Sequence, residues 1–214
     1  ELNSPSGITF DNDGNVYISD TYNNCVKVFT DEGKHIQTIG KSDGEDGLNL
    51  PWRLSIGPDS NIYVADWGND RICSYDKNGN FISAYGKSGL GEGQLLKPAD
   101  VIVDKSGNVY ACDWGNERIQ VFSNSGDFLE MNLGESKLSG WAKDFFSVNV
   151  EEAQTRSTAN LNISDIPFVN PNDRHEISSH IEEYFWGPTS LNIGPDGKLY
   201  VLEVNRHRIQ VFNI

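Results

Sequence analysis

One candidate metal-binding motif is the segment His175-Glu-Ile-Ser-Ser-His180, which contains two histidines. A zinc-binding helix of the zincin type needs two histidines four residues apart, so that both imidazoles project from one face. Here the spacing is five, which places the two side chains about 140° apart around a helix. The pattern therefore predicts a solvated helix rather than a metal site.

A second candidate is the acidic stretch Asp11-Asn-Asp-Gly-Asn15, which has the composition of a calcium-binding loop. An EF-hand loop needs its glycine at position six and a glutamate at position twelve. Counted from Asp11, Gly14 falls at position four and Tyr22 at position twelve. We interpret this stretch as a turn between two strands.

The three cysteines, Cys25, Cys73 and Cys112, lie far apart and include no Cys-x-x-Cys pair. Such an odd and sparse set is neither a disulfide framework nor a zinc cluster, and we expect these residues to fill strands. The sequence also contains no Gly-x-Ser-x-Gly nucleophile motif and no phosphate-binding loop. It therefore predicts no catalytic residue, no metal ligand and no cofactor.

The tetrapeptide Asp-Trp-Gly-Asn occurs twice, at residues 66–69 and 113–116, and an arginine follows two residues later each time. A recurring motif indicates a structural unit, because a catalytic motif need appear only once. We expect the acid to end one strand and the arginine to begin the next, so that carboxylate and guanidinium meet across the hairpin. The predicted structural pairs are Asp66 with Arg71, Asp113 with Arg118, and Glu203 with Arg208.

The same turns also allow a functional interpretation. Trp67 and Trp114 would present neighbouring aromatic surfaces on one rim of the fold, with Asn69 and Asn116 beside them. Exposed aromatic side chains often mark recognition surfaces, and beside carboxylates they suit protein or sugar contacts. These four residues are the predicted binding residues.

The turns belong to a unit that recurs along the chain at steps of 46, 47 and 90 residues. Each unit contains short segments rich in Val, Ile, Tyr and Phe, separated by turn dipeptides such as Asp-Gly and Asn-Gly. The units begin at Pro5, Pro51, Pro98 and Pro188, and their second segments share a tyrosine column at Tyr17, Tyr63, Tyr110 and Tyr200.

The second segment of each unit is apolar on both faces, so both faces must be covered. Twisted four-stranded sheets stacked around an axis provide that cover, which predicts an all-β chain folded as a β-propeller. We expect a single domain over residues 1–214, with blades at about 5–40, 51–86, 98–134 and 188–214.

The units resemble the NHL repeat, whose pattern is Pro-x-Gly-Ile, then Gly-Asn-x-Tyr-Val-x-Asp, then Asn-x-Arg-Ile-Gln-Val-Phe. The match departs at Cys25, in the arginine column, and at Glu203, in the acid column. The resemblance implies a propeller that usually has six blades, whereas four are recognisable and the fourth lacks its outermost strand. We expect a partial or incompletely closed ring, either a segment of a longer protein or a protomer that closes its ring by homo-oligomerisation.

Residues 135–187 do not fit a blade and are predicted to form an insertion with one or two short helices. Trp141, Phe145 and Val148 recur at helical spacing, as do Ile177, Ile181 and Tyr184 after a cap at Asn172 or Asp173. A degenerate blade hidden in this segment is the alternative. A finer resemblance to bacterial NHL proteins rests on Trp141-Ala142, Phe185-Trp-Gly-Pro188 and Arg206–Val211.

The balance of 17 basic and 31 acidic residues, a formal net charge of −14, argues against nucleic-acid binding. RNA binding, as in the NHL domains of regulatory proteins, therefore fits poorly. No apolar run approaches the roughly 18 residues of a membrane span. The chain begins Glu-Leu-Asn-Ser-Pro, without signal-peptide features, so we predict a soluble protein whose compartment stays open between periplasmic, extracellular and cytoplasmic.

These observations favour a non-enzymatic propeller that serves as a binding scaffold for a protein or peptide, with carbohydrate as another ligand class. The alternative is a propeller enzyme of the lyase or lactonase type, which would hold a metal in its central channel. The strands expected to line that channel offer Asp100 and Asn192 as candidate ligands and no histidine in register. The sequence therefore favours binding over catalysis.

Overall fold

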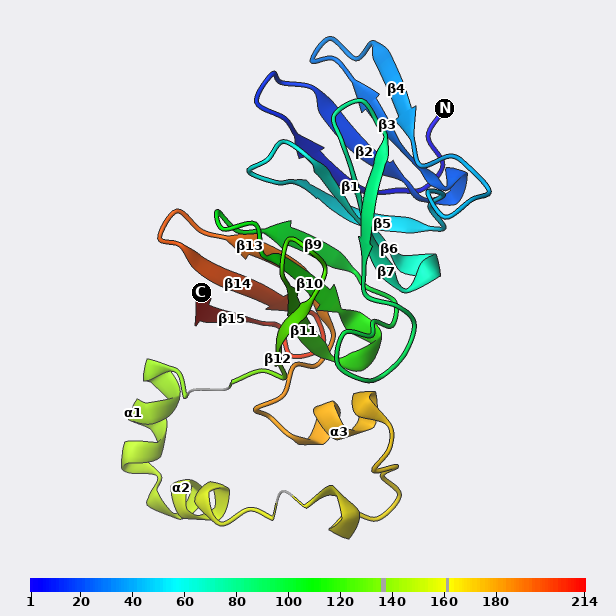
Figure 1. The fold of residues 1–214 in the computed structure, drawn as a ribbon. Helices are drawn as coiled ribbons and strands as arrows, with labels where there is room; N and C mark the ends of the chain where they lie inside the picture. Colours follow the sequence, from blue (N-terminus) through cyan, green and yellow to red (C-terminus); the bar gives the residue numbers. More distant parts are fainter. Residues whose placement is uncertain (136–137, 161) are drawn as a thin grey trace.

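The computed structural model describes residues 1–135, 138–160 and 162–214, and its strands form four antiparallel sheets (Figure 1). The first sheet contains β1 (Pro5–Phe10), β2 (Val16–Asp20), β3 (Cys25–Phe29) and β4 (His35–Ile39). The second contains β5 (Pro51–Ile56), β6 (Ile62–Asp66), β7 (Arg71–Tyr75) and β8 (Phe81–Tyr85). The third contains β9 (Asp100–Val103), β10 (Val109–Asp113), β11 (Arg118–Phe122) and β12 (Phe128–Asn132). The fourth contains β13 (Pro188–Ile193), β14 (Lys198–Glu203) and β15 (Arg208–Asn213).

The strands follow one another in chain order within each sheet, as in the blades of a propeller. The first strands of successive sheets, β1, β5, β9 and β13, lie side by side, so the sheets fan about a shared centre (Figure 1). The predicted all-β propeller is confirmed, and its four blades form an incomplete ring. The fourth blade has three strands within the described residues.

Apolar side chains from facing sheets form one core between each pair of neighbouring blades. The first core joins Val26 and Val28 of β3 to Ile62 and Val64 of β6. The second core lies between blades two and three, and the third between blades three and four. The second strands of the two middle blades, β6 and β10, are thus covered on both faces and buried along their whole length, which explains their continuous apolar sequence.

The tyrosine that recurs in each second strand has a hydrogen-bond partner in the turn that precedes it. The hydroxyl of Tyr63 donates to Asp59 Oδ2 at 3.0 Å, and the equivalent bonds join Tyr17 to Asp11, Tyr110 to Asp104, and Tyr200 to Asp196. In the Asp11 turn the carboxylate also accepts from the backbone N–H groups of Asp13 and Asn15. The calcium-like stretch is therefore a turn closed by its own donors.

The insertion between blades three and four contains α1 (Gly140–Val148), α2 (Val150–Ser157), a 3-10 turn η4 (Ile163–Asp165) and α3 (Arg174–His180) (Figure 1). This is one helix more than predicted, because the first helical stretch is interrupted at Asn149. Residues 136–137 and 161 of the predicted insertion lie outside the described residues. Blade four packs directly on blade three, and the described part of the insertion contains no strand.

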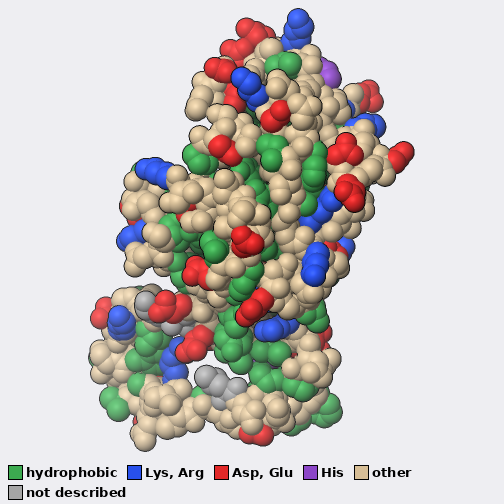
Figure 2. All heavy atoms as spheres, in the orientation of Figure 1, with side chains coloured by type: hydrophobic (Ala, Val, Ile, Leu, Met, Phe, Trp, Pro, Cys, Tyr) green, Lys and Arg blue, Asp and Glu red, His purple; other side chains and the backbone are tan. Residues whose placement is uncertain are grey.

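The helix α1 exposes its apolar side rather than burying it. Trp141 and Phe145 stack on one another, with ring centroids 6.0 Å apart, and Trp141 and Val148 are 77% and 78% exposed. Figure 2 shows hydrophobic side chains at the surface of the insertion. Further along the insertion, Asp173 caps the N-terminus of α3 by accepting a hydrogen bond from His175 N. None of the helices in the described ranges has the length and hydropathy of a membrane span.

Candidate functional site: the acid–arginine rim

The acid at the end of each second strand meets a cation across the hairpin, as the repeated motif predicts. Between these residues the chain forms 3-10 turns, η2 (Trp67–Asn69) and η3 (Trp114–Asn116). Arg71 Nε donates to Asp66 Oδ2 at 2.8 Å, and Arg118 Nε donates to Asp113 Oδ2 at 2.7 Å. In the fourth blade Arg208 Nε donates to Glu203 Oε1 at 2.5 Å.

Each pair also holds the segment that leads into its own blade. Asp113 Oδ1 accepts from Leu96 N at 2.7 Å, two residues before Pro98. Arg118 Nη2 donates to the carbonyl oxygens of Gly91 and Gln94 in the same segment. Asp66 and Glu203 accept in the same way from Asn49 N and Trp186 N. The acid–arginine pairs therefore bind the segment that leads into the innermost strand of their own blade.

The first blade departs from this pattern at Cys25, which is buried in the arginine column. Lys27 supplies the cation instead, with Nζ 2.7 Å from Asp20 Oδ2. Lys27 lies two residues further along β3, so its side chain emerges on the same face as that of Cys25. The blade keeps an ion pair at this place with a different residue. Burial raises the pKa of Cys25, Cys73 and Cys112, which makes these thiols poor nucleophiles.

Of the two predicted binding asparagines, Asn116 lies beneath the rim and Asn69 is exposed on it. Asn116 is 1% exposed, and its Nδ2 donates to Asp113 Oδ2 at 2.8 Å and to Gly89 O at 3.0 Å. Asn69 is exposed, but its Nδ2 likewise donates to Asp66 Oδ2 at 2.9 Å. Both amides serve the carboxylate of their own hairpin, which leaves the tryptophans as the candidate contact residues.

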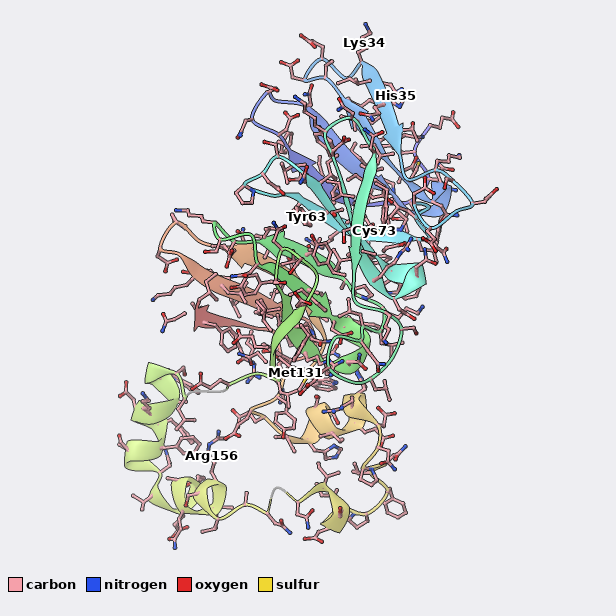
Figure 3. All side chains as sticks on the ribbon, viewed as in Figure 1. Lys34, His35, Tyr63, Cys73, Met131 and Arg156 are labelled. Atoms are coloured by element: carbon pink, nitrogen blue, oxygen red, sulfur yellow. The ribbon has the colours of Figure 1, made fainter. Side chains whose placement is uncertain are left out.

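Burial raises the pKa of two acids in the third blade, Asp113 and Glu117. The pKa of Asp113 is raised by burial, although Leu96 N and Arg118 act in the opposite direction. The pKa of Glu117 is also raised by burial, against its bonds to Gly187 N and His175. Met131, which Figure 3 labels on β12, places its sulfur 3.1 Å from Arg118 Nη1. The Asp113–Arg118 pair and Glu117 thus form a buried ionic network in the third blade.

A second repeated contact, which the strand pattern does not predict, joins each of the first three blades to the next one. The residue before each arginine has a left-handed backbone, with φ of 55° at Asp70 and 54° at Glu117. Asp70 Oδ1 accepts from Lys97 N at 2.9 Å, and Glu117 Oε2 accepts from Gly187 N at 2.6 Å. Asn24 accepts from Leu50 N in the same way. A signal for this contact is present in the sequence: Asn24, Asp70 and Glu117 each stand four places after a strand-ending aspartate.

The aromatic surface of the rim centres on a tryptophan pair in the second blade. Trp52, which is 40% exposed, lies with its ring centroid 6.2 Å from that of Trp67. Lys97 Nζ lies 4.7 Å from the Trp67 ring and 3.2 Å from Asp70 Oδ1. Trp114 of the third blade is 37% exposed. The repeated motif predicts Trp67 and Trp114 but neither Trp52 nor Lys97, although Trp52 directly follows the proline that begins the second blade.

The innermost strands bring a second set of polar groups together near the axis. Asp100 Oδ2 accepts from Leu191 N at 2.9 Å and from Ser190 Oγ at 3.1 Å. The exposed Arg53 donates from Nη1 to Ser190 Oγ at 3.3 Å. Burial raises the pKa of Asp100 to about 6, against the lowering effects of the Leu191 N–H and Arg53. The other predicted channel candidate, Asn192, is exposed.

Metal-ligating side chains do not cluster in the described part of the chain, where no group of three or more His, Cys, Asp or Glu residues could hold an ion. His175 makes a local contact instead: its Nδ1 lies 2.6 Å from Glu117 Oε1. Its Nε2 lies 3.2 Å from Trp186 Nε1, the indole N–H donating. His180 Nδ1 contacts Glu176 O of its own helix. The two histidines of α3 therefore do not form a joint site.

Comparison with protein families agrees with this architecture. The NHL repeat model matches residues 2–29 and 185–212, and the model described as 6-bladed beta-propeller matches residues 57–166. The latter match covers half of the chain. The protein belongs to this family of NHL-repeat β-propellers. A sequence comparison with curated proteins finds no match.

Several solved structures share the fold at low sequence identity. A virginiamycin B lyase from Staphylococcus aureus is 16% identical, with a TM-score of 0.56 over 98% of this chain and 55% of that chain. A putative 6-phosphogluconolactonase from Bacteroides uniformis is 14% identical, with a TM-score of 0.58 over 98% and 50%. A protein of unknown function from Bacteroides thetaiotaomicron is 13% identical, with a TM-score of 0.61 over 99% and 47%. This chain spans about half the length of each of them.

Proposed function

We propose that this propeller is a binding module that recognises a protein or peptide through the rim formed by Trp52, Trp67, Lys97 and Trp114. The observation that carries the proposal is the Trp52–Trp67 pair, with centroids 6.2 Å apart and Lys97 4.7 Å from the Trp67 ring. Rigid aromatic side chains next to a cation provide contact area and hydrogen-bonding capacity at low entropic cost. The ion pairs Asp66–Arg71 and Asp113–Arg118 brace the hairpins that carry Trp67 and Trp114.

The charge distribution narrows the class of partner. The protein has a net charge of −14, so a generally anionic partner is repelled at long range. Lys97 and Arg53 nevertheless place two cations close to the aromatic pair and to the axis. A peptide with aromatic or aliphatic anchors and one acidic group at the point of contact fits this surface.

The test is a selection from a displayed peptide library on the immobilised wild-type protein, followed by affinity measurements on variants. Changing Trp67 and Trp114 together to alanine is expected to weaken selected peptides at least about tenfold, since each lost aromatic contact costs about 1 kcal/mol or more. Trp141→Ala is the matched control, because Trp141 is an exposed tryptophan on the insertion. Equal affinity for wild type and the double variant would contradict the proposal.

A propeller enzyme of the lyase or lactonase type is the second candidate. The observation in its favour is the buried Asp100, which has a pKa of about 6 and shares Ser190 as a hydrogen-bond partner with the exposed Arg53. Carboxyl groups with a shifted pKa are enriched in catalytic sites. Against it, each oxygen of Asp100 already accepts from this chain's own donors. Elemental analysis of protein purified without chelators separates the candidates: a stoichiometric metal that Asp100→Asn removes would favour the enzyme.

A further inference from the structure

The residue two places after each blade-starting proline differs from blade to blade. The four residues are Gly7, Arg53, Asp100 and Ser190. They belong to the innermost strands β1, β5, β9 and β13, which lie side by side about the shared centre (Figure 1). In a repeat array the contacts between neighbouring units recur with the units. A position that varies at the axis can therefore carry a residue for a ligand without disturbing the repeat.

The three polar residues of this set form a hydrogen-bond chain across the axis. Arg53 of blade two donates from Nη1 to Ser190 Oγ of blade four at 3.3 Å. Ser190 Oγ in turn donates to Asp100 Oδ2 of blade three at 3.1 Å. A hydroxyl has one proton to donate and two lone pairs to accept with, so each bond has a consistent direction. The chain holds the guanidinium of Arg53 in one orientation at the axis.

Arg53 keeps donors and charge for a further partner. In the described part of the chain Arg53 forms no ion pair, whereas the arginines of the three acid–arginine pairs are each bound to an acid. Its guanidinium can bind a carboxylate through two parallel N–H groups. The other cation beside the aromatic pair, Lys97, is already 3.2 Å from Asp70 Oδ1. Of the two cations, Arg53 is therefore the one that can receive an acidic group.

Arg53 is continuous with the aromatic surface of the rim. It directly follows Trp52, and both side chains are exposed although they are consecutive in β5. The register of β5 shifts between Pro51 and Leu54, which frees the two residues from strict alternation. A Cβ on Gly7 would lie 2.7 Å from Trp52 O and 2.9 Å from Arg53 Cα, so β1 packs closely against this irregular segment. A ligand that contacts the Trp52 ring thus has Arg53 within reach of its next group.

We propose that Arg53 binds a carboxylate of the peptide partner, with Ser190 and Asp100 holding the guanidinium in place. This inference rests on the proposed function, and it makes the acidic group of the partner a carboxylate next to the aromatic or aliphatic anchor. A carboxylate, with its single charge, is favoured over a phosphate dianion, because Asp100 and the net charge of −14 oppose a second negative charge.

Asp100 gives the site a pH dependence. The groups that face it are Arg53 from β5, Cys112 opposite it on β10, and Ser190 with the Leu191 N–H from β13. Burial raises the pKa of Asp100 to about 6, so below that pH it no longer offsets the charge of Arg53. A glutamate of the partner, with an ordinary pKa of about 4.3, is still mostly ionised at about pH 5. Carboxylate binding is therefore expected to tighten a few-fold from about pH 7.5 to about pH 5, and to stay constant in Asp100→Asn.

The test uses N-acetyl-Trp-Glu amide and its neutral analogue N-acetyl-Trp-Gln amide as probes. ¹⁵N-resolved NMR follows the Nε–H signal of Arg53, assigned with Arg53→Lys, and the indole signal of Trp52. The acidic probe is expected to shift both signals with one dissociation constant. The neutral probe is expected to bind about fivefold to tenfold more weakly and to leave the Arg53 signal unmoved, since the charge-assisted bonds are lost. N-acetyl-Trp-Gly with a free carboxylate distinguishes a terminal carboxylate from a side-chain carboxylate.

Arg53→Gln is expected to bind both probes equally weakly. Lys105→Gln is the matched control: Lys105 is exposed in the turn between β9 and β10, and its loss changes the net charge by the same unit. This control is expected to keep the preference for the acidic probe, and Arg53→Lys to keep part of it, because lysine retains the charge without the planar fork.

An Arg53 signal that responds to neither carboxylate probe would overturn the proposal, as would a preference for the acidic probe that survives in Arg53→Gln. Tighter binding of N-acetyl-Trp-phosphoserine amide than of the glutamate probe would overturn the choice of a carboxylate. If Trp52 responds equally to both probes while Arg53 stays unmoved, the rim stands and the carboxylate site falls. If Arg53 responds to the acidic probe while Trp52 does not, the carboxylate site stands and the proposed rim contact falls.

Discussion

Arg118 and Asp113 form the most deeply buried of the three acid–arginine pairs: Nε lies 2.7 Å from Oδ2, and the side chains are 2% and 0% exposed. Arg71 and Arg208, in the equivalent places, are 18% and 23% exposed. The same motif therefore produces ionic contacts of different depth. The depth decides how much the fold depends on each pair, because a buried charge that loses its partner cannot be solvated.

Replacing Arg118 by methionine tests this dependence. The change leaves Asp113 buried without its cation, so the free energy of unfolding is expected to fall by about 3–5 kcal/mol. Arg71→Met is the matched control and is expected to cost about 1–2 kcal/mol, since the Arg71 side chain is 18% exposed and water can approach Asp66 once the guanidinium is gone. Urea unfolding of both variants measures the difference. Equal losses in the two variants would show that the burial of an ion pair does not determine how much it contributes to the free energy of unfolding.

Asp100 gives the fold a defined pH dependence. Its pKa in the folded protein is about 6, above the ordinary value of 3.8. The folded state therefore binds this proton more tightly than the unfolded chain does. The resulting stabilisation is fully present below about pH 3.8 and is lost as the pH rises through about 6.

The measurement for Asp100 is urea unfolding at several pH values on wild type and Asp100→Asn, so that all other groups cancel in the difference. Relative to the variant, the wild type is expected to lose up to about 3 kcal/mol between pH 4 and pH 7. A difference that stays constant over this range would contradict a raised pKa.

The contact between Asp70 and Lys97 N fastens blade two to blade three. Asp70→Ala removes this acceptor and the one for Ser88 Oγ, and it places alanine at a φ of 55°. We expect a loss of about 1–3 kcal/mol in thermal or urea unfolding. Asp70→Asn is the matched control: blade one has Asn24 at this position, and asparagine tolerates the left-handed backbone. The interpretation fails if both variants are equally destabilised.

His175 fastens the helix α3 to the propeller through Glu117 and Trp186. His175→Ala removes both contacts, whereas Glu117 keeps Gly187 N as a donor. Hydrogen exchange in residues 174–180 is expected to become about tenfold faster, while the midpoint of global unfolding changes little. His180→Ala is the control, because His180 contacts only its own helix and the neighbouring Ser179 among the described bonds. Unchanged exchange in α3 would show that the helix is held elsewhere.

The sequence was sufficient for the blades because their period and strand chemistry repeat. Asp66 with Arg71 could be placed across a hairpin from their spacing alone, as could the equivalent pairs. The orientation of the Asn116 side chain could not be predicted, because an asparagine in a tight turn can bond either a ligand or groups of its own hairpin. Which of the two it does depends on how the preceding segment packs against the turn. The interblade contacts of Asp70 and Glu117 require the relative position of two blades, which a period does not supply.

The proposed rim was only partly accessible from the sequence. Trp67 and Trp114 follow from the repeated motif, but the ring that lies next to Trp67 is Trp52, from the start of the same blade. Trp52 lies between the paired residues Pro51 and Leu54, where the register of β5 shifts. Such irregularities re-aim side chains in ways that strand periodicity does not predict. Lys97 reaches the Trp67 ring from the segment that leads into the next blade, and no local sequence pattern predicts this contact.

The most direct test of the binding account uses the five tryptophans as reporters. Their indole N–H groups give five signals in a ¹⁵N-resolved NMR spectrum, assigned by substituting Trp52, Trp67, Trp114, Trp141 and Trp186 one at a time. On titration with a peptide selected on the wild-type protein, the signals of Trp52, Trp67 and Trp114 are predicted to shift together with one dissociation constant, while that of Trp141 stays in place. Shifts confined to Trp141 or Trp186, with the three rim signals unmoved, would contradict the account.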